Sequence, residues 1–202
     1  MADPPRDLPA KVTTPAERDG SLVVGDPLRN LPQARREAEA VHAALSARGQ
    51  PSALQLGEQA TRSALRQALG TVRHLHYAGH GRFGGEGWDS ALPLADGELN
   101  AGDILTLPVP PVVVLAGCET GRAAEGPLES IGLAQAFILA GARAVVASSR
   151  PVDDRMAARL SEALYEQGGR PEPPALPERL RQAQRKLRDE GADWSAFRVL
   201  VQ

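Results

Sequence analysis

The chain has 202 residues, of which 23 are basic and 25 acidic, giving a formal net charge of −2. This length suits one α/β domain with a sizeable core, and the balanced charge, without a long block of one sign, argues against nucleic acid as the main partner. Because the chain has one cysteine, no basic-then-apolar leader and no apolar run near ~18 residues, we expect a cytoplasmic protein without a membrane span.

The start of the chain differs in composition from the rest. Residues 1–20 are rich in proline and charge and have no hydrophobic period, which predicts a flexible arm or linker ahead of a domain at 21–202. The apolar run at 21–24 predicts a first strand, which ends in the turn Gly25-Asp26-Pro27. A helix is predicted from Pro32 to just before Gly49, because apolar residues recur on one helical face: Ala34, Ala38, Val41 and Leu45.

The next segments alternate between strand and helix patterns. Residues 51–56 predict a second strand, and Thr61 is the expected N-cap of a helix that ends at Leu69. Residues 72–77 predict a third strand, which leads into His80. Short apolar segments on both sides of Asp96-Gly97 predict a hairpin, followed by a brief helix with Asn100 as its cap.

The last third of the chain continues this alternation. A fourth strand is predicted over 112–116, a buried helix over 130–140 and a fifth strand over 144–147. An amphipathic helix from about Met156 to Leu164, a Pro/Gly loop over 168–177, a helix around 180–187 and a final edge strand within 194–201 follow. This order of elements predicts parallel βαβ units.

Two of the predicted strands end beside a reactive side chain. His80 follows the third strand and Cys118 follows the fourth, and glycine flanks both. Because the carboxyl ends of parallel strands share one edge of the sheet, an imidazole and a thiol meeting there would form a general base and its nucleophile. A lone cysteine in an apolar strand usually acts as a small buried hydrophobe. His74 and His76 compete with His80, but strand alternation places those two together on one face of the sheet.

Three segments of the chain are specific enough to indicate a family. They are His76-Tyr77-Ala78-Gly79-His80-Gly81, Ser90-Ala91-Leu92-Pro93-Leu94-Ala95-Asp96-Gly97 and Leu115-Ala116-Gly117-Cys118-Glu119-Thr120-Gly121. Further segments of the same kind lie at 25–27, 30–32, 132–137, 140–148, 152–154 and 194–197. In this order along residues 21–202, the segments resemble the CHAT-domain family of caspase-like cysteine peptidases (clan CD).

The resemblance implies a caspase-like three-layer α/β/α sandwich. Its six-stranded, mostly parallel sheet would have the order 2-1-3-4-5-6 with the last strand antiparallel. The resemblance also implies a catalytic dyad of His80 and Cys118. The chain departs from the family pattern where Arg150 replaces an aromatic residue before Pro-Val-Asp, and it has none of the helical repeats to which family members are often fused.

The expected chemistry is peptide hydrolysis through a thiolate. A free cysteine thiol with a pKa near ~8.5 is mostly protonated at neutral pH, so His80 would accept its proton and later return it to the leaving amine. The backbone N–H groups of Gly81 and Cys118 are the expected oxyanion donors. No metal or other cofactor is expected.

The expected substrate pocket rests on the caspase-like pattern, in which the segments after strands one and five line it. Asp26 and Asp153 would then face a basic P1 side chain, while Arg150 could neutralise either carboxylate. The alternative is that Asp153 caps the following helix and Asp26 only shapes a turn.

The expected function is a cysteine endopeptidase that cleaves a specific protein partner. Family analogy suggests a role in bacterial defence or regulated cell death, with a gasdermin-like pore former as one substrate and an upstream sensor or regulatory protein as another partner. Activation through the loop 119–129, with self-cleavage after Arg122, is also predicted. The alternative is a catalytically silent CHAT interaction or signalling module. A nucleotide-binding protein is set aside, because no GxGxxG or GxxxxGK[ST] loop follows the first strand.

Overall fold

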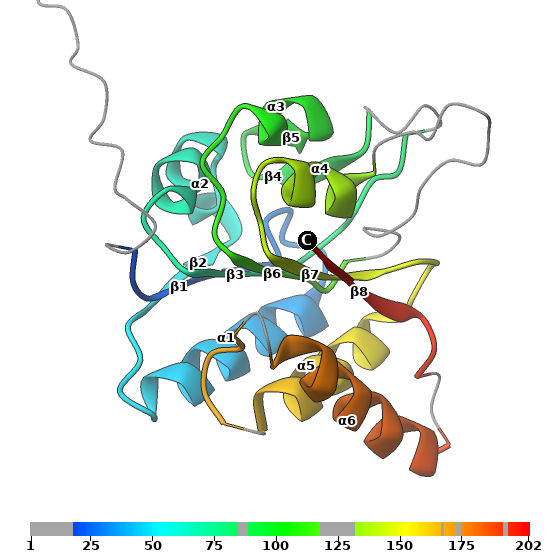
Figure 1. Ribbon diagram of the computed structural model, residues 1–202. Helices are drawn as coiled ribbons and strands as arrows, with labels where there is room; N and C mark the ends of the chain where they lie inside the picture. Colours follow the sequence, from blue (N-terminus) through cyan, green and yellow to red (C-terminus); the bar gives the residue numbers. More distant parts are fainter. Residues whose placement is uncertain (1–17, 85–88, 118–131, 167, 173–174, 192–193) are drawn as a thin grey trace, which may run out of the picture.

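One mostly parallel sheet organises the chain (Figure 1). The computed structural model describes residues 18–84, 89–117, 132–166, 168–172, 175–191 and 194–202. The sheet has the order β2-β1-β3-β6-β7-β8, and all neighbours are parallel except β7 and β8. Its strands are β1 (Ser21–Gly25), β2 (Ser52–Leu56), β3 (His74–Ala78), β6 (Val112–Leu115), β7 (Ala144–Ser148) and β8 (Phe197–Val201).

The predicted strand order is confirmed. A separate antiparallel hairpin of β4 (Ala91–Leu94) and β5 (Gly97–Asn100) is inserted between β3 and β6. When these two strands are left out of the count, the sheet reads 2-1-3-4-5-6 with the last strand antiparallel. The hairpin lies where the Asp96-Gly97 turn predicts it.

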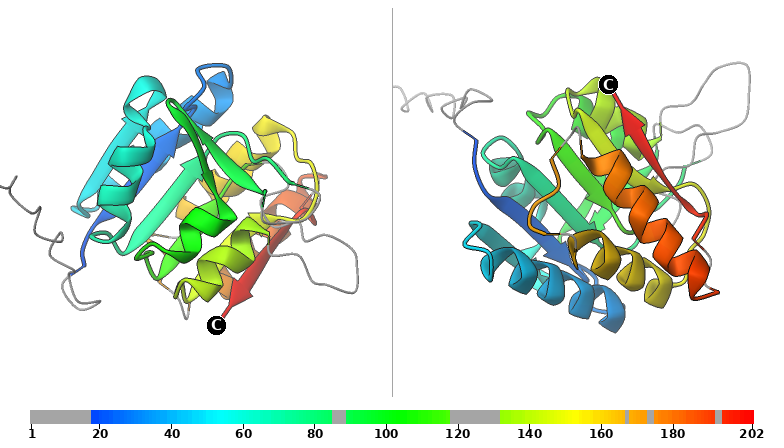
Figure 2. Two further views of the ribbon diagram at one scale, coloured as in Figure 1. Left: turned by 90° about the horizontal axis from the view of Figure 1, so that it is seen from above. Right: turned by 60° about the horizontal axis from the view of Figure 1, so that its bottom comes forward.

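Helices cover both faces of the sheet, so the predicted α/β/α sandwich is also confirmed (Figures 1 and 2). On one face, α1 (Pro32–Ser46), α5 (Asp154–Glu166) and α6 (Leu176–Asp189) lie side by side. The other face carries the hairpin with α2 (Arg62–Leu69), α3 (Ala101–Leu105) and α4 (Leu133–Leu139). A short 3₁₀ turn, η1 (Gly57–Gln59), follows β2.

Alternation along the central strands divides the core into two layers. In β1, Leu22 and Val24 pack toward α2, α3 and α4, whereas Val23 packs toward α1 and α5. All three are fully buried. Successive side chains of a strand point to opposite faces, so a strand covered on both sides reads as a continuous apolar run. This explains why these strands can be predicted from continuous apolar runs in the sequence.

Local capping fixes several of the helix starts. The Thr61 hydroxyl accepts a hydrogen bond from the Ala64 N–H at 3.2 Å, and the Asn100 side chain accepts one from the Asp103 N–H at 2.8 Å. Pro32 occupies the first turn of α1, where its missing N–H costs no helical hydrogen bond. Both predicted caps are therefore confirmed.

Several element boundaries differ from the expected ones by two residues or more. Helix α6 begins at Leu176, so the end of the predicted loop 168–177 belongs to the helix. Pro177 fits there for the same reason that Pro32 fits in α1. The first residues of the helix predicted over 130–140 lie outside the described residues, and α4 begins at Leu133. Within the described part of the chain, no helix is long and apolar enough to cross a membrane.

Candidate active site

The parallel strands bring three of the predicted site residues, Asp26, His80 and Asp153, to one edge of the sheet. Hydrogen bonds tie the segments that follow these strands to one another. The Asp26 N–H donates to the Ala78 carbonyl at 2.9 Å, and the Ala116 N–H donates to the Tyr77 carbonyl at 2.8 Å. The buried Ser148 hydroxyl donates to the Gly117 carbonyl at 2.7 Å. The segments that directly follow β1, β3, β6 and β7 therefore lie next to one another.

His80 is held by an asparagine that the sequence did not single out. Its Nε2 lies 3.0 Å from Oδ1 of Asn30, which belongs to the turn between β1 and α1. Because an amide oxygen only accepts hydrogen bonds, His80 carries its proton on Nε2. In the neutral ring Nδ1 is then the basic nitrogen, so this tautomer leaves a proton acceptor on the other side of the imidazole.

The backbone at His80 is fixed by a buried tyrosine. The Tyr77 hydroxyl lies 2.9 Å from the His80 carbonyl and 2.7 Å from the Pro93 carbonyl, and it can donate to both oxygens. Burial raises the pKa of Tyr77 well above its usual value, so the hydroxyl stays protonated and remains a donor. A Cβ on Gly79 would lie 2.9 Å from this hydroxyl and 3.0 Å from Pro27 Cδ. Glycine is therefore required before His80 for a steric reason.

Asp26 shapes the turn that presents Asn30. It is 5% exposed and has a φ of 46°, a left-handed conformation that Asp and Asn tolerate better than most residues. Its Oδ1 accepts hydrogen bonds from the N–H groups of Asn30 and Leu31, each at 2.9 Å. The turn-shaping alternative for Asp26 is therefore observed, and a contact with substrate stays a prediction.

The segment after β7 adds two carboxylates. Oδ1 of Asp153 accepts a hydrogen bond from the Arg155 N–H at 2.9 Å, so Asp153 caps α5, as the alternative interpretation states. The pKa of Asp154 is raised, first by burial and then by the charges of Asp153 and Asp26, while His80 opposes the shift. Three carboxylates and the imidazole thus share one electrostatic neighbourhood.

The side chain of Arg150 contacts the segment before β8. The side chain is exposed, and Nη2 donates to the Ser195 hydroxyl at 3.1 Å, in the segment that leads into β8. Neutralisation of Asp26 or Asp153 by Arg150 stays a prediction.

The nucleophile side of the site falls outside the described residues. Cys118, the loop 119–129 and Arg122 all lie in the range 118–131, so the predictions about them rest on the sequence. Gly81 is described and half-buried, and its N–H donates no hydrogen bond to another described residue. That free donor is what an oxyanion site requires.

The competing histidines have other partners. His74 and His76 are fully buried beneath α1 and α5, and both contact the Tyr165 hydroxyl, at 2.8 Å and 3.1 Å. Neither can reach a substrate without unfolding the helical layer. Among the described residues, no group of three or more His, Cys, Asp or Glu side chains is arranged to hold a metal ion.

Comparison with known proteins finds one matching family model and several solved structures of similar fold. The family model described as "CHAT domain" matches residues 3–201. The separase chain of the Saccharomyces cerevisiae separase–securin complex superposes with a TM-score of 0.67 and 16% identity, over 92% of this chain and 12% of that one. Gingipain R, described as an Arg-specific cysteine proteinase, superposes with a TM-score of 0.64 and 15% identity, over 95% of this chain and 48% of that one.

Another gingipain structure gives the same result. The complex of the pro- and mature domains of RgpB from Porphyromonas gingivalis has a TM-score of 0.63 at 12% identity, covering 92% of this chain and 47% of that one. No curated protein matches the chain. At these identities the likeness establishes the fold, and this chain spans only a part of each of the larger proteins.

Proposed function

The chain belongs to the CHAT domain family, and from this membership we propose that it is a cysteine endopeptidase with Cys118 as nucleophile and His80 as general base. The observation that carries the proposal is the anchoring of His80 by Asn30 at the carboxyl edge of the sheet. The contact with Asn30 fixes the tautomer of His80, and the hydrogen bond from Tyr77 fixes its backbone carbonyl. Both contacts orient the imidazole, as a general base requires.

The pairing register of the sheet supports a dyad. Tyr77 of β3 pairs with Leu115 of β6 in adjacent parallel strands. His80 and Cys118 each stand three residues after these paired positions. Equal distances along the chain from paired positions favour a meeting of the two side chains at the edge of the sheet.

The chemistry follows from the tautomer of His80. Nδ1 of His80 takes the proton of the Cys118 thiol, and the thiolate attacks the carbonyl carbon of the scissile peptide. The N–H groups of Gly81 and Cys118 stabilise the oxyanion of the tetrahedral intermediate. When the intermediate collapses, the C–N bond breaks and His80 gives its proton to the leaving amine. Water, deprotonated by His80, then hydrolyses the thioester and restores the thiol.

A basic P1 side chain is the proposed specificity. The electrostatic contact among Asp26, Asp153 and Asp154 gives this edge of the sheet an excess of negative charge beside His80. A buried carboxylate facing a guanidinium or ammonium group forms a charge-assisted hydrogen bond. Gingipain R is described as Arg-specific, which supports the same assignment here. We propose a protein as the substrate. A defence role, a gasdermin-like target and an upstream sensor stay predictions.

Active-site labelling tests the proposal. A peptidyl acyloxymethyl ketone with arginine at P1 should label the wild-type chain at Cys118. The label should be absent from Cys118→Ala and strongly reduced in His80→Ala. His42→Ala is the matched control, because His42 is a half-buried histidine of α1 that contacts Ser52 at 3.0 Å. That variant should label like the wild type.

Alkylation by iodoacetamide tests the dyad without requiring a bound peptide. If His80 activates the thiol, Cys118 should react at pH 6 at least ten-fold faster in the wild type than in His80→Ala. The reason is that lowering the pKa of a thiol by about one unit raises its thiolate fraction roughly ten-fold at a pH below that pKa. Equal alkylation rates, together with no labelling by the ketone, would contradict the peptidase and favour the silent interaction module.

A further inference from the structure

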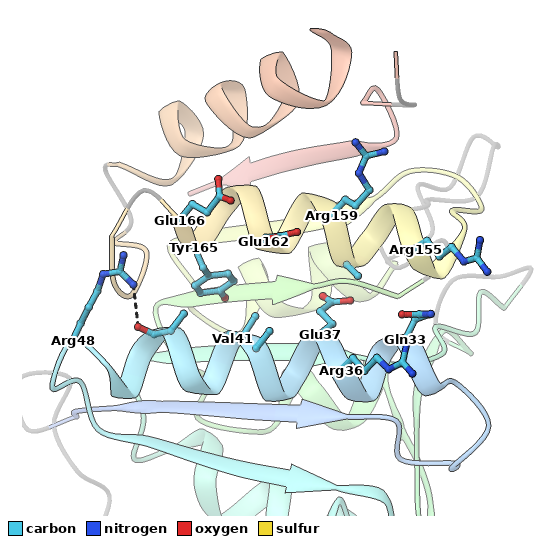
Figure 3. A pocket seen from close by; sticks show the side chains of 13 residues that line it. Gln33, Arg36, Glu37, Val41, Arg48, Arg155, Arg159, Glu162, Tyr165 and Glu166 are labelled. Carbon is cyan, nitrogen blue, oxygen red and sulfur yellow. Dashed lines mark hydrogen bonds between the residues drawn. The ribbon is translucent and has the colours of Figure 1, made fainter. Parts of the chain in front are cut away.

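A cavity of about 630 Å³ lies between α1 and α5, on the face of the sheet opposite the hairpin (Figure 3). Its volume is within the range of about 300–1,000 Å³ that small-molecule sites occupy. Small apolar side chains form much of its walls, namely Ala40, Val41, Ala44 and Ala158. His80 is not among its described lining residues, so the proposed peptidase activity does not account for it.

A chain of hydrogen bonds under this cavity ends on one buried carboxylate. His74 is neutral, because burial lowers its pKa well below the usual value, and its Nδ1 has no partner in the described chain. Its Nε2 lies 2.8 Å from the Tyr165 hydroxyl, and that hydroxyl lies 3.1 Å from Nδ1 of His76. Nε2–H of His76 donates to Oε1 of Glu37 at 3.0 Å, and the Ser161 hydroxyl donates to the same oxygen at 2.6 Å.

This arrangement uses only one of the two carboxylate oxygens of Glu37, Oε1. The Glu37 side chain is 2% exposed. A buried carboxylate is costly unless it is paired and hydrogen-bonded, so a partner for its second oxygen would stabilise it.

The second oxygen of Glu37 faces the cavity. Oε2 forms no hydrogen bond with any described residue, and it is not one of the fully enclosed atoms that lack a partner. Glu37 lines the cavity, and Figure 3 shows its carboxylate in the space between the two helices. A ligand in the cavity can therefore reach an acceptor that the protein leaves open.

Positive groups stand at the end of the cavity where both helices begin. Arg36 of α1 and Arg155 of α5 line it there and are exposed (Figure 3). Neither guanidinium forms an ion pair or a hydrogen bond with another described residue. A ligand that offered only a cation to Glu37 would meet these two charges unfavourably, whereas a carboxylate on the same ligand would pair with them.

We propose that this cavity binds a small aliphatic amino acid, with its ammonium or guanidinium group on Glu37 Oε2 and its carboxylate on Arg36 and Arg155. The methylene groups between the two charged ends pack against Ala158. Binding requires neither Cys118 nor His80, so it is independent of the proposed peptidase activity.

Calorimetric titration of the full chain tests the proposal with matched probes. L-Lysine and 6-aminohexanoate should bind with a Kd of about 1 mM or tighter. Hexanoate lacks the ammonium group and hexylamine lacks the carboxylate, so each should bind at least ten-fold more weakly than 6-aminohexanoate. Glu37→Gln should weaken L-lysine binding by roughly ten- to hundred-fold, because it removes the charge from a hydrogen bond of a charged group. Glu39→Gln, the same change at an exposed residue of α1 that does not line the cavity, should leave binding unchanged.

A second variant tests the proposal independently, in case Glu37→Gln does not fold. Ala158→Phe fills the cavity from a half-exposed position and leaves the hydrogen-bonded chain intact, so it should fold and lose L-lysine binding. The proposal is overturned if neither probe binds the wild type at 10 mM, or if Glu37→Gln folds and binds as well as the wild type. Binding of the peptide acetyl-Glu-Ala-Ala-Lys-Ala-Ala-Glu-amide without binding of the free amino acids would overturn it as well, and would assign the cavity to a protein partner.

Discussion

Asp26 can be tested for two roles that a single substitution would confuse. Its Oδ1 holds the N–H groups of Asn30 and Leu31, and its charge contributes to the acidic edge beside His80. Asp26→Asn keeps an oxygen acceptor in the same place and tolerates the φ of 46°, but it removes the charge. Asp26→Ala removes both the acceptor and the charge.

The magnitudes follow from these contacts. Loss of a side-chain oxygen that caps backbone N–H groups costs about 1–2 kcal/mol. Placing alanine in a left-handed conformation adds roughly 1 kcal/mol. Asp26→Ala should therefore lower the free energy of unfolding by about 2–3 kcal/mol, or the Tm by roughly 4–12 °C for a domain of this size. Asp26→Asn should lose less than about 1 kcal/mol, since a neutral acceptor gives a weaker bond that is still formed.

Two assays separate the roles. Urea unfolding followed by circular dichroism gives the stabilities, and cleavage of peptides that differ only at P1 gives the preference for arginine over leucine. Asp26→Asn should fold almost normally and reduce that preference at least ten-fold. Equal destabilisation by both substitutions would refute the capping argument. An unchanged arginine preference in Asp26→Asn would refute its role in the pocket.

Three further predictions concern the surroundings of His80. Asn30→Ala should slow peptide turnover by roughly ten-fold, because the imidazole loses its fixed tautomer, while Tm stays within a few degrees. Tyr77→Phe should lower the free energy of unfolding in urea by about 1–2 kcal/mol, because it removes the donor of the His80 and Pro93 carbonyls; an unchanged midpoint would mean that this hydroxyl does not hold the turn. Asp154→Asn should raise the urea midpoint at pH 7. The folded-state pKa of Asp154 is raised, so its charged form destabilises the fold above that pKa, and the gain should vanish below the ordinary value of 3.8; a gain that persists at pH 3 would exclude this cause.

Hydrophobic periodicity is a local property, and it determined the order of the elements. The strand runs at 21–24, 72–77, 112–116 and 144–147 are continuous and apolar because helices cover both faces of this sheet. The helix face from Ala34 to Leu45 and the caps at Thr61 and Asn100 are equally local. Segments of this kind give the sheet, its layers and the edge where His80 lies, and the resemblance to a known family supplied the strand order.

Tertiary structure decided which side chains meet. Asn30 and His80 are 50 residues apart, and no local pattern marks an asparagine in a turn as a histidine partner. Glu37 reads as a polar position on an amphipathic helix, yet the packing of α1 against α5 buries it against Ser161, 124 residues away. Hydrogen bonds between distant segments depend on the angle and distance at which packed elements meet. The sequence therefore determined which elements form and roughly where the chemistry lies, whereas the fold decided the partners of each reactive group.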